Sequence, residues 1–104
     1  MTDPRIPTHA DSRRALRRPV HLAAQLRDRG ATKFSIELID LSVTGFRAES
    51  SFILHEGTLV WLTLPGMAGL EATVMWRDGF LYGCAFAKPL YPAVFDHIVK
   101  LSEG

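Results

Sequence analysis

Single polar residues separate the apolar residues along much of the chain. Val20, Leu22, Ala24 and Leu26 are spaced by two, which is typical of a strand with one buried face. The same period returns in several later stretches, and turn residues lie between them. The predicted strands cover residues 20–26, 34–38, 46–49, 58–64, 70–77 and 81–86. Six short, evenly spaced strands predict an all-β fold, a small antiparallel β-barrel, because a closed sheet leaves few free edges.

The end of the chain has a different period. Val94, Phe95, Ile98 and Leu101 follow the spacing of one helix face, and Pro92 suits a first helical turn. We therefore expect a short C-terminal helix that caps the barrel or contacts a dimer partner. Its polar side is predicted to carry Asp96, His97 and Lys100.

The chain of 104 residues is long enough for one core. Residues 1–12 have two prolines and no apolar period, so we predict a flexible N-terminal arm followed by a single domain over 13–104. Trp61 and Trp76 are expected in the core. Cys84 is expected to be a small buried apolar residue.

The net charge of +1 conceals an uneven distribution. Seven of the 12 basic residues precede residue 30, with only three acidic residues beside them, and this favours a localised anion site. The single cysteine excludes an internal disulfide and a cysteine-based zinc site. No apolar stretch is long enough for a membrane span and no secretory signal is visible, so we expect a cytoplasmic protein without membrane insertion.

Two short segments carry the candidate chemistry. Residues 13–18 hold four arginines within six positions, and residues 40–45 place a carboxylate, a hydroxyl and a glycine between two apolar runs. Arginine offers a planar fork of donors that fits phosphate oxygens and the O6/N7 edge of guanine. The second segment adds acceptors and a backbone that a ligand can approach closely. Together they predict a pocket for an anionic guanine nucleotide, with candidate residues Arg13, Arg14, Arg17, Arg18, Asp40, Ser42 and Gly45.

These segments resemble the motifs of the PilZ family of bacterial cyclic di-GMP receptors. The family pattern is RxxxR in an N-terminal loop, followed by [D/N]xSxxG between the second and third strands. Arg13 and Arg17 match the first motif, and Asp40, Ser42 and Gly45 match the second. The resemblance implies a second-messenger receptor that is not an enzyme and that signals to an unidentified downstream protein by a change of conformation.

The resemblance extends beyond the motifs, over about residues 12–102. Residues 70–76 look like the family strand that ends in valine-x-tryptophan, and residues 83–86 look like its closing glycine-x-x-phenylalanine strand. Arg14 and Arg18 also satisfy RxxxR. The first pair is favoured because the family usually has one residue between the second arginine and the following proline.

The resemblance also implies a role for each site residue. The arginines would bind phosphate and the guanine O6/N7 edge, and Asp40 would accept hydrogen bonds from guanine N1–H and the exocyclic amine. Ser42 would add a hydroxyl contact, and Gly45 would permit the turn and keep a side chain out of the pocket. No cofactor is expected other than the ligand, cyclic di-GMP, bound to a monomer or weak homodimer.

The residues themselves leave other interpretations open. The four histidines are scattered and predict no metal site, and no catalytic motif is recognisable. The arginine segment could be a solvated arm, and Asp40 and Ser42 could simply cap a turn. One alternative function is a nucleotide-independent PilZ-like adaptor in motility or secretion machinery. A barrel that binds single-stranded nucleic acid is a third, but an aromatic platform beside a basic groove is not evident, so no nucleic-acid partner is predicted.

Overall fold

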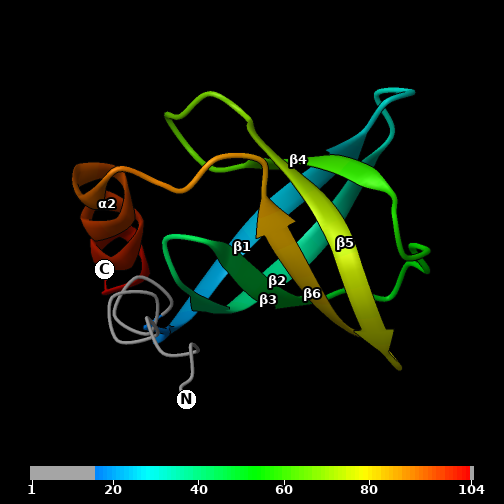
Figure 1. Cartoon of the computed structure of the whole chain (residues 1–104), viewed down its shortest axis with the longest axis horizontal. Coiled ribbons are helices and arrows are strands. Elements are labelled where there is room, and N and C mark those ends of the chain that lie inside the picture. The colour runs from blue at the N-terminus through cyan, green and yellow to red at the C-terminus, as the bar shows by residue number, and fades with distance from the viewer. Residues whose placement is uncertain (1–15, 104) are drawn as a thin grey trace, which may run out of the picture.

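The computed structural model describes residues 16–103, which form a closed barrel of antiparallel strands with one helix at its side (Figure 1). The order around the barrel is β1-β2-β3-β6-β5-β4, and β4 closes on β1. The predicted six-stranded antiparallel barrel is confirmed. The predicted arm over residues 1–12 lies outside the described residues, as do Arg13 and Arg14. The strands are β1 (Arg18–Asp28), β2 (Lys33–Leu41), β3 (Gly45–Glu49), β4 (Leu59–Thr63), β5 (Leu70–Asp78) and β6 (Leu81–Phe86).

The inward face of every strand contributes to one core. Leu26, Leu38, Leu62 and Val74, from four different strands, are each fully buried at 0% exposure, as their alternation with polar neighbours predicts. Each such side chain contributes roughly 1.5–3 kcal/mol relative to an exposed one. The core is therefore the main source of stability.

An irregularity in β2 changes which face its last residues occupy. Leu38 pairs with Ala48 but Asp40 pairs with Arg47, so Ile39 is an extra residue on β2. A bulge of this kind resets the alternation of faces. Leu41 consequently returns to the core, whereas Asp40 lies beside Arg47. The turn predicted over residues 40–45 is correspondingly shorter, because Asp40 belongs to β2 and Gly45 begins β3.

A second irregularity moves Trp76 out of the core. Val74 pairs with Cys84 and Trp76 pairs with Gly83, which leaves Met75 as the extra residue on β5. Trp76 is 38% exposed, so its predicted core position is wrong. Trp61 is also only half-buried, and the Arg27 guanidinium lies 4.8 Å from its ring centroid. It therefore belongs to the outer face of β4, next to β1.

The predicted C-terminal helix is α2 (Pro92–Glu103), and it packs against β1 of its own barrel (Figure 1). Ile98 is buried as expected, and Val99 joins it on the buried face. The three polar residues predicted on the outer side, Asp96, His97 and Lys100, are exposed. Close to the end of the helix the Ser102 hydroxyl accepts a hydrogen bond of 3.1 Å from the His21 amide. The helix thus caps the barrel near the start of β1.

The loop after β3 is tied to the core by one tyrosine. The Tyr82 hydroxyl is fully buried, donates to the Phe52 carbonyl and accepts from the Leu54 amide at 3.0 Å. These contacts hold the loop against the end of the barrel. A buried hydroxyl with two backbone partners is costly to remove, because both partners lose a hydrogen bond.

We expect Tyr82→Phe to lower the free energy of unfolding by about 1–3 kcal/mol, since the Phe52 carbonyl and the Leu54 amide are left unpaired. Urea denaturation followed by circular dichroism measures the change. Tyr91→Phe is the matched control, because Tyr91 is 79% exposed. Equal unfolding midpoints for the two variants would contradict this account of the loop.

Candidate functional site

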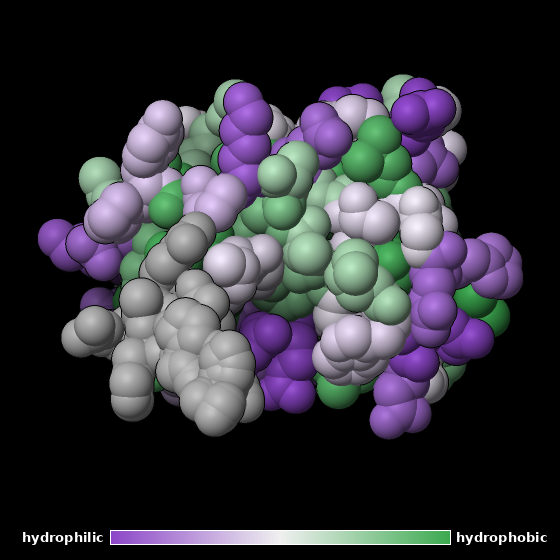
Figure 2. All heavy atoms as spheres, in the orientation of Figure 1, coloured by the Kyte–Doolittle hydropathy of each residue, from purple (hydrophilic) through white to green (hydrophobic). Residues whose placement is uncertain are grey.

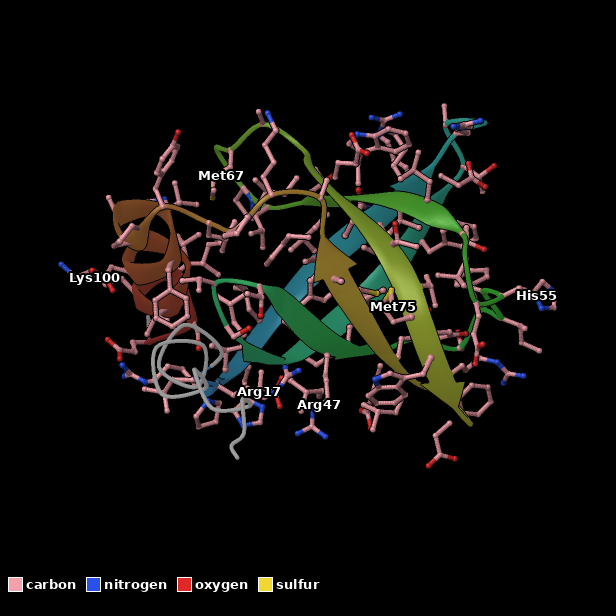
Figure 3. All side chains as sticks on the ribbon, in the orientation of Figure 1. Arg17, Arg47, His55, Met67, Met75 and Lys100 are labelled. Carbon is pink, nitrogen blue, oxygen red and sulfur yellow. The ribbon has the colours of Figure 1, made fainter. Side chains whose placement is uncertain are left out.

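One carboxylate organises the candidate site. Asp40, at the end of β2, has only 7% of its side chain exposed, and its two oxygens contact two different arginines. Arg17 Nη1 lies 2.8 Å from Oδ1, and Arg47 Nε lies 2.6 Å from Oδ2. Figure 3 shows Arg17 and Arg47 side by side at this edge of the barrel. The structure therefore joins one residue from each predicted motif, Arg17 and Asp40, and adds Arg47 from β3.

The site carries more positive than negative charge. Two guanidinium groups share one carboxylate, and 48% of the Arg17 side chain and 38% of the Arg47 side chain remain exposed. The pKa of Arg47 is raised above its usual value, first by its hydrogen bond to Asp40 and second by the charge of that carboxylate. Each guanidinium has five N–H donors, more than these contacts use. The arrangement can accept an anion with planar acceptor edges.

The turn between β2 and β3 depends on Ser42, which is 1% exposed. Its hydroxyl oxygen accepts from the Thr44 amide and the Gly45 amide, both at 3.1 Å, and lies 3.0 Å from the Thr44 hydroxyl. These are the contacts of a serine that caps a turn. In this conformation Ser42 fixes the loop next to Asp40, and its hydroxyl is directed at the backbone.

Gly45 is needed for a reason that the motif alone does not reveal. A Cβ at this position would collide with the Cys84 carbonyl of β6, because the two strands approach each other closely here. Among the described glycines, positive φ occurs at Gly57, Gly66 and Gly79 but not at Gly45. The close approach of β6, and not the conformation of the turn, therefore demands a glycine.

A pocket of about 200 Å³ lies beside Arg17. It is lined by Arg17, Gly45, Met75, Trp76 and Gly83, among others. A Cβ on Gly83 would overlap the Trp76 indole, so this glycine lets the ring lie against the backbone of β6. Figure 2 shows this face, with apolar side chains in green over β5 and β6 and a hydrophilic patch in purple at its lower edge. An aromatic surface and cationic donors thus meet in one place.

Comparison with known proteins identifies the family of the domain. The PilZ domain family model matches residues 11–104, which is nearly the whole chain. The chain belongs to the PilZ domain family. At the level of the family this is a binding domain for cyclic di-GMP and generally not an enzyme. A search of curated protein sequences found no match to the chain.

The other arginines of the first motif are not seen in contact with Asp40. Arg13 and Arg14 lie outside the described residues. Arg18 begins β1 opposite Leu41, and the salt bridges among residues 16–103 do not include it. Contact with Asp40 is made by Arg17, a member of the favoured RxxxR pair.

Two residues of the site were not predicted. Arg47 lies two positions after Gly45, between the inward residues Phe46 and Ala48, so the alternation in β3 could have placed it on the outer face. Its contact with Asp40 could not be foreseen, because it requires the extra residue in β2. Trp76 was missed for the same reason, since the bulge in β5 turns it outward.

The described residues give no support for a metal site, a membrane-spanning helix or a reactive thiol. Among residues 16–103 no group of three or more potential metal ligands comes together. No helix within that range is long and apolar enough to cross a membrane. Burial raises the pKa of the Cys84 thiol from 9.0 to about 12, so the thiol stays neutral near pH 7, and the expected small buried residue is confirmed. A neutral, buried thiol is a poor nucleophile.

The pKa of the Cys84 thiol is 9.0 in the unfolded chain and about 12 in the folded protein. Between these values the unfolded chain loses the thiol proton and the folded protein keeps it, so rising pH favours unfolding. Its contribution to stability is complete below pH 9.0 and is lost progressively as the pH rises towards 12. We expect the difference in free energy of unfolding between the wild-type protein and Cys84→Ala to fall by up to about 1.4 kcal/mol per pH unit in this range. Urea denaturation of both proteins across this range is the measurement. Parallel stability curves would contradict the raised pKa.

Proposed function

We propose that this PilZ domain is a receptor for cyclic di-GMP, which it binds through both motifs, and that binding is relayed to a partner protein. The observation that supports this most directly is the convergence of Arg17 and Arg47 on Asp40 at the edge of the pocket that Arg17 lines. The ligand has two phosphodiesters and two guanines, so it needs cationic donors, base-edge contacts and a stacking surface.

Arg13 and Arg17 supply the main contacts to phosphate oxygens and to guanine O6/N7. A bidentate contact of this kind contributes about 1–3 kcal/mol of discrimination against another base. Arg47 adds a second fixed guanidinium, because two of its nitrogens are held by Asp40. The rest of its donors can face the ligand without reorganisation of the side chain.

Asp40 takes part by exchanging its contact with Arg17 for a contact with guanine. Its two oxygens are occupied by Arg17 and Arg47 in the structure described here, and the carboxylate is nearly buried. A phosphate attracts the Arg17 guanidinium and so releases Oδ1, which can then accept from guanine N1–H and the exocyclic amine. Adenine presents no donor at the equivalent ring nitrogen. Asp40 thus contributes guanine selectivity only after Arg17 has moved.

Trp76 provides the stacking surface. Its ring is held against β6 over Gly83, and 38% of the residue is exposed beside Arg17. Stacking of one base on an aromatic side chain contributes about 1–3 kcal/mol. Ser42 and Gly45 act indirectly, because one caps the turn after Asp40 and the other lets β3 and β6 approach.

Relay to a partner follows from the same exchange. Arg17 directly precedes β1 and contacts Asp40. When Arg17 turns to phosphate, we expect the residues before it to be drawn over the pocket while the barrel keeps its form. Ordering of a segment by contacts between arginine and phosphate is an established type of switch.

One observation favours a second function, a nucleotide-independent adaptor. Asp40 is already neutralised by two arginines of its own chain, so this carboxylate needs no ligand to balance its charge. Titration calorimetry with cyclic di-GMP separates the two functions. A receptor binds at micromolar concentration or tighter, whereas an adaptor gives no heat.

We expect Arg17→Ala and Arg47→Ala each to weaken cyclic di-GMP binding by about 2–4 kcal/mol, because each removes a charge-assisted contact to a desolvated ligand. Titration calorimetry measures the loss. Arg29→Ala is the matched control, since Arg29 is an exposed arginine in the loop between β1 and β2. Normal binding by both site variants would rule out this pocket.

Asp40→Ala should weaken cyclic di-GMP binding and reduce its margin over cyclic di-AMP, because the acceptor for guanine N1–H is lost. Asp40→Asn should be milder, since a carbonyl acceptor remains. Competition titrations with both nucleotides give the two affinities. An equal loss for the two nucleotides would mean that Asp40 only positions Arg17 and Arg47.

A further inference from the structure

Exposed apolar side chains occur in two segments at the end of the barrel remote from helix α2. They are Phe80 in the β5–β6 hairpin, 60% exposed, and Phe52 and Ile53 in the loop after β3, 47% and 59% exposed. Figure 1 shows this hairpin and helix α2 at opposite ends of the molecule. A groove of about 430 Å³ opens here, lined in part by Glu37, Glu49 and Phe80.

The groove has a carboxylate on each of two neighbouring strands. Glu37 of β2 lies directly opposite Glu49 of β3, and like charges in this arrangement destabilise a sheet. Neither carboxylate takes part in the salt bridges found within residues 16–103. Glu49 is opposite Leu81, which is opposite Asp78, so a third carboxylate continues the same row. This row across four strands thus holds three carboxylates and no cationic side chain.

Hydrogen bonds within the chain fix the walls of the groove. The Ser50 amide donates to the Phe80 carbonyl at 3.0 Å, and the Ser50 hydroxyl donates to the Ser35 carbonyl at 3.2 Å. The Phe52 amide in turn donates to the Ser50 hydroxyl at 3.1 Å. Because the surface is already ordered, little conformational entropy is lost when a partner binds to it.

We propose that this groove binds a segment of another protein that carries a lysine or arginine next to an apolar side chain. The cationic group lies between Glu37 and Glu49 and relieves their repulsion, and the apolar side chain packs on Phe80. Charge complementarity of this kind selects the partner and excludes acidic segments, nucleic acid and anionic lipid. An exposed apolar surface with a polar rim is typical of a protein interaction site.

The groove is separate from the nucleotide pocket but close to it. The linings of the two share no residue. Arg47 and Glu49 lie two positions apart on β3, which places their backbones about 7 Å from each other on one face. Partner binding as proposed here does not require cyclic di-GMP, so it stands or fails independently of the proposed receptor function.

The test begins with selection of displayed random peptides on the immobilised full-length chain without nucleotide. Enriched peptides should carry lysine or arginine beside an aromatic or aliphatic residue. A synthetic copy of the most enriched peptide is then titrated against variants. The double variant Glu37→Gln/Glu49→Gln, and separately Phe80→Ser, should each weaken binding by about tenfold or more.

Matched controls on the same chain keep the test specific. Asp96→Asn removes an exposed carboxylate from helix α2, and Tyr91→Ser removes a more exposed aromatic ring, and neither should change affinity. Arg17→Ala, which disables the proposed nucleotide pocket, should also leave peptide binding intact. In the unmodified protein, amide chemical shifts should change around Glu49 and Phe80 when the peptide is added.

Several outcomes would overturn the proposal. They are failure to select any peptide, enrichment of acidic peptides, and unchanged affinity in the Glu37→Gln/Glu49→Gln variant. A concentration-dependent dimer of the free chain that the same substitutions dissociate would assign the groove to a second copy and would equally reject a heterologous partner.

Discussion

Closure of the sheet between β1 and β4 is the constraint on which the rest of this molecule depends. A closed barrel of this size has an interior that side chains fill completely, so every binding function must lie on its outside. Closure also leaves each strand paired on both sides, which fixes the register of the outer face. The outward-facing residues of the site are therefore held by a framework that is built mainly by the core.

The site arises where that regular framework is interrupted. An extra residue at Ile39 brings Asp40 beside Arg47, and an extra residue at Met75 brings Trp76 to the surface. Glycines on β3 and β6 then allow a strand and an indole ring to approach the backbone of β6. Bulges are common near binding sites because they redirect a side chain without disturbing the strands on either side.

The sequence predicts the barrel well because alternation is strict where a strand has one buried face, as in residues 20–26 and 34–38. It also predicts that Arg17 and Asp40 belong to one site, because the two motifs occur together. It fails at Trp76 and Arg47, whose surroundings depend on a change of register that involves two strands at once. A bulge leaves no local signal in the strand that contains it, so period-two reasoning continues through β5 and assigns Trp76 to the wrong face.

The separation of Arg47 and Glu49 along β3 has a thermodynamic consequence. Their backbones are about 7 Å apart, less than the Debye length at physiological ionic strength, so a charge bound at one residue is only partly screened from the other. An anion held by Arg47 therefore makes the surroundings of Glu49 more negative and more attractive to a cation. Linkage makes this effect reciprocal: whatever positive group occupies Glu49 increases the affinity of Arg47 for an anion by the same factor. One strand of five residues can thus couple two sites without any movement of the backbone.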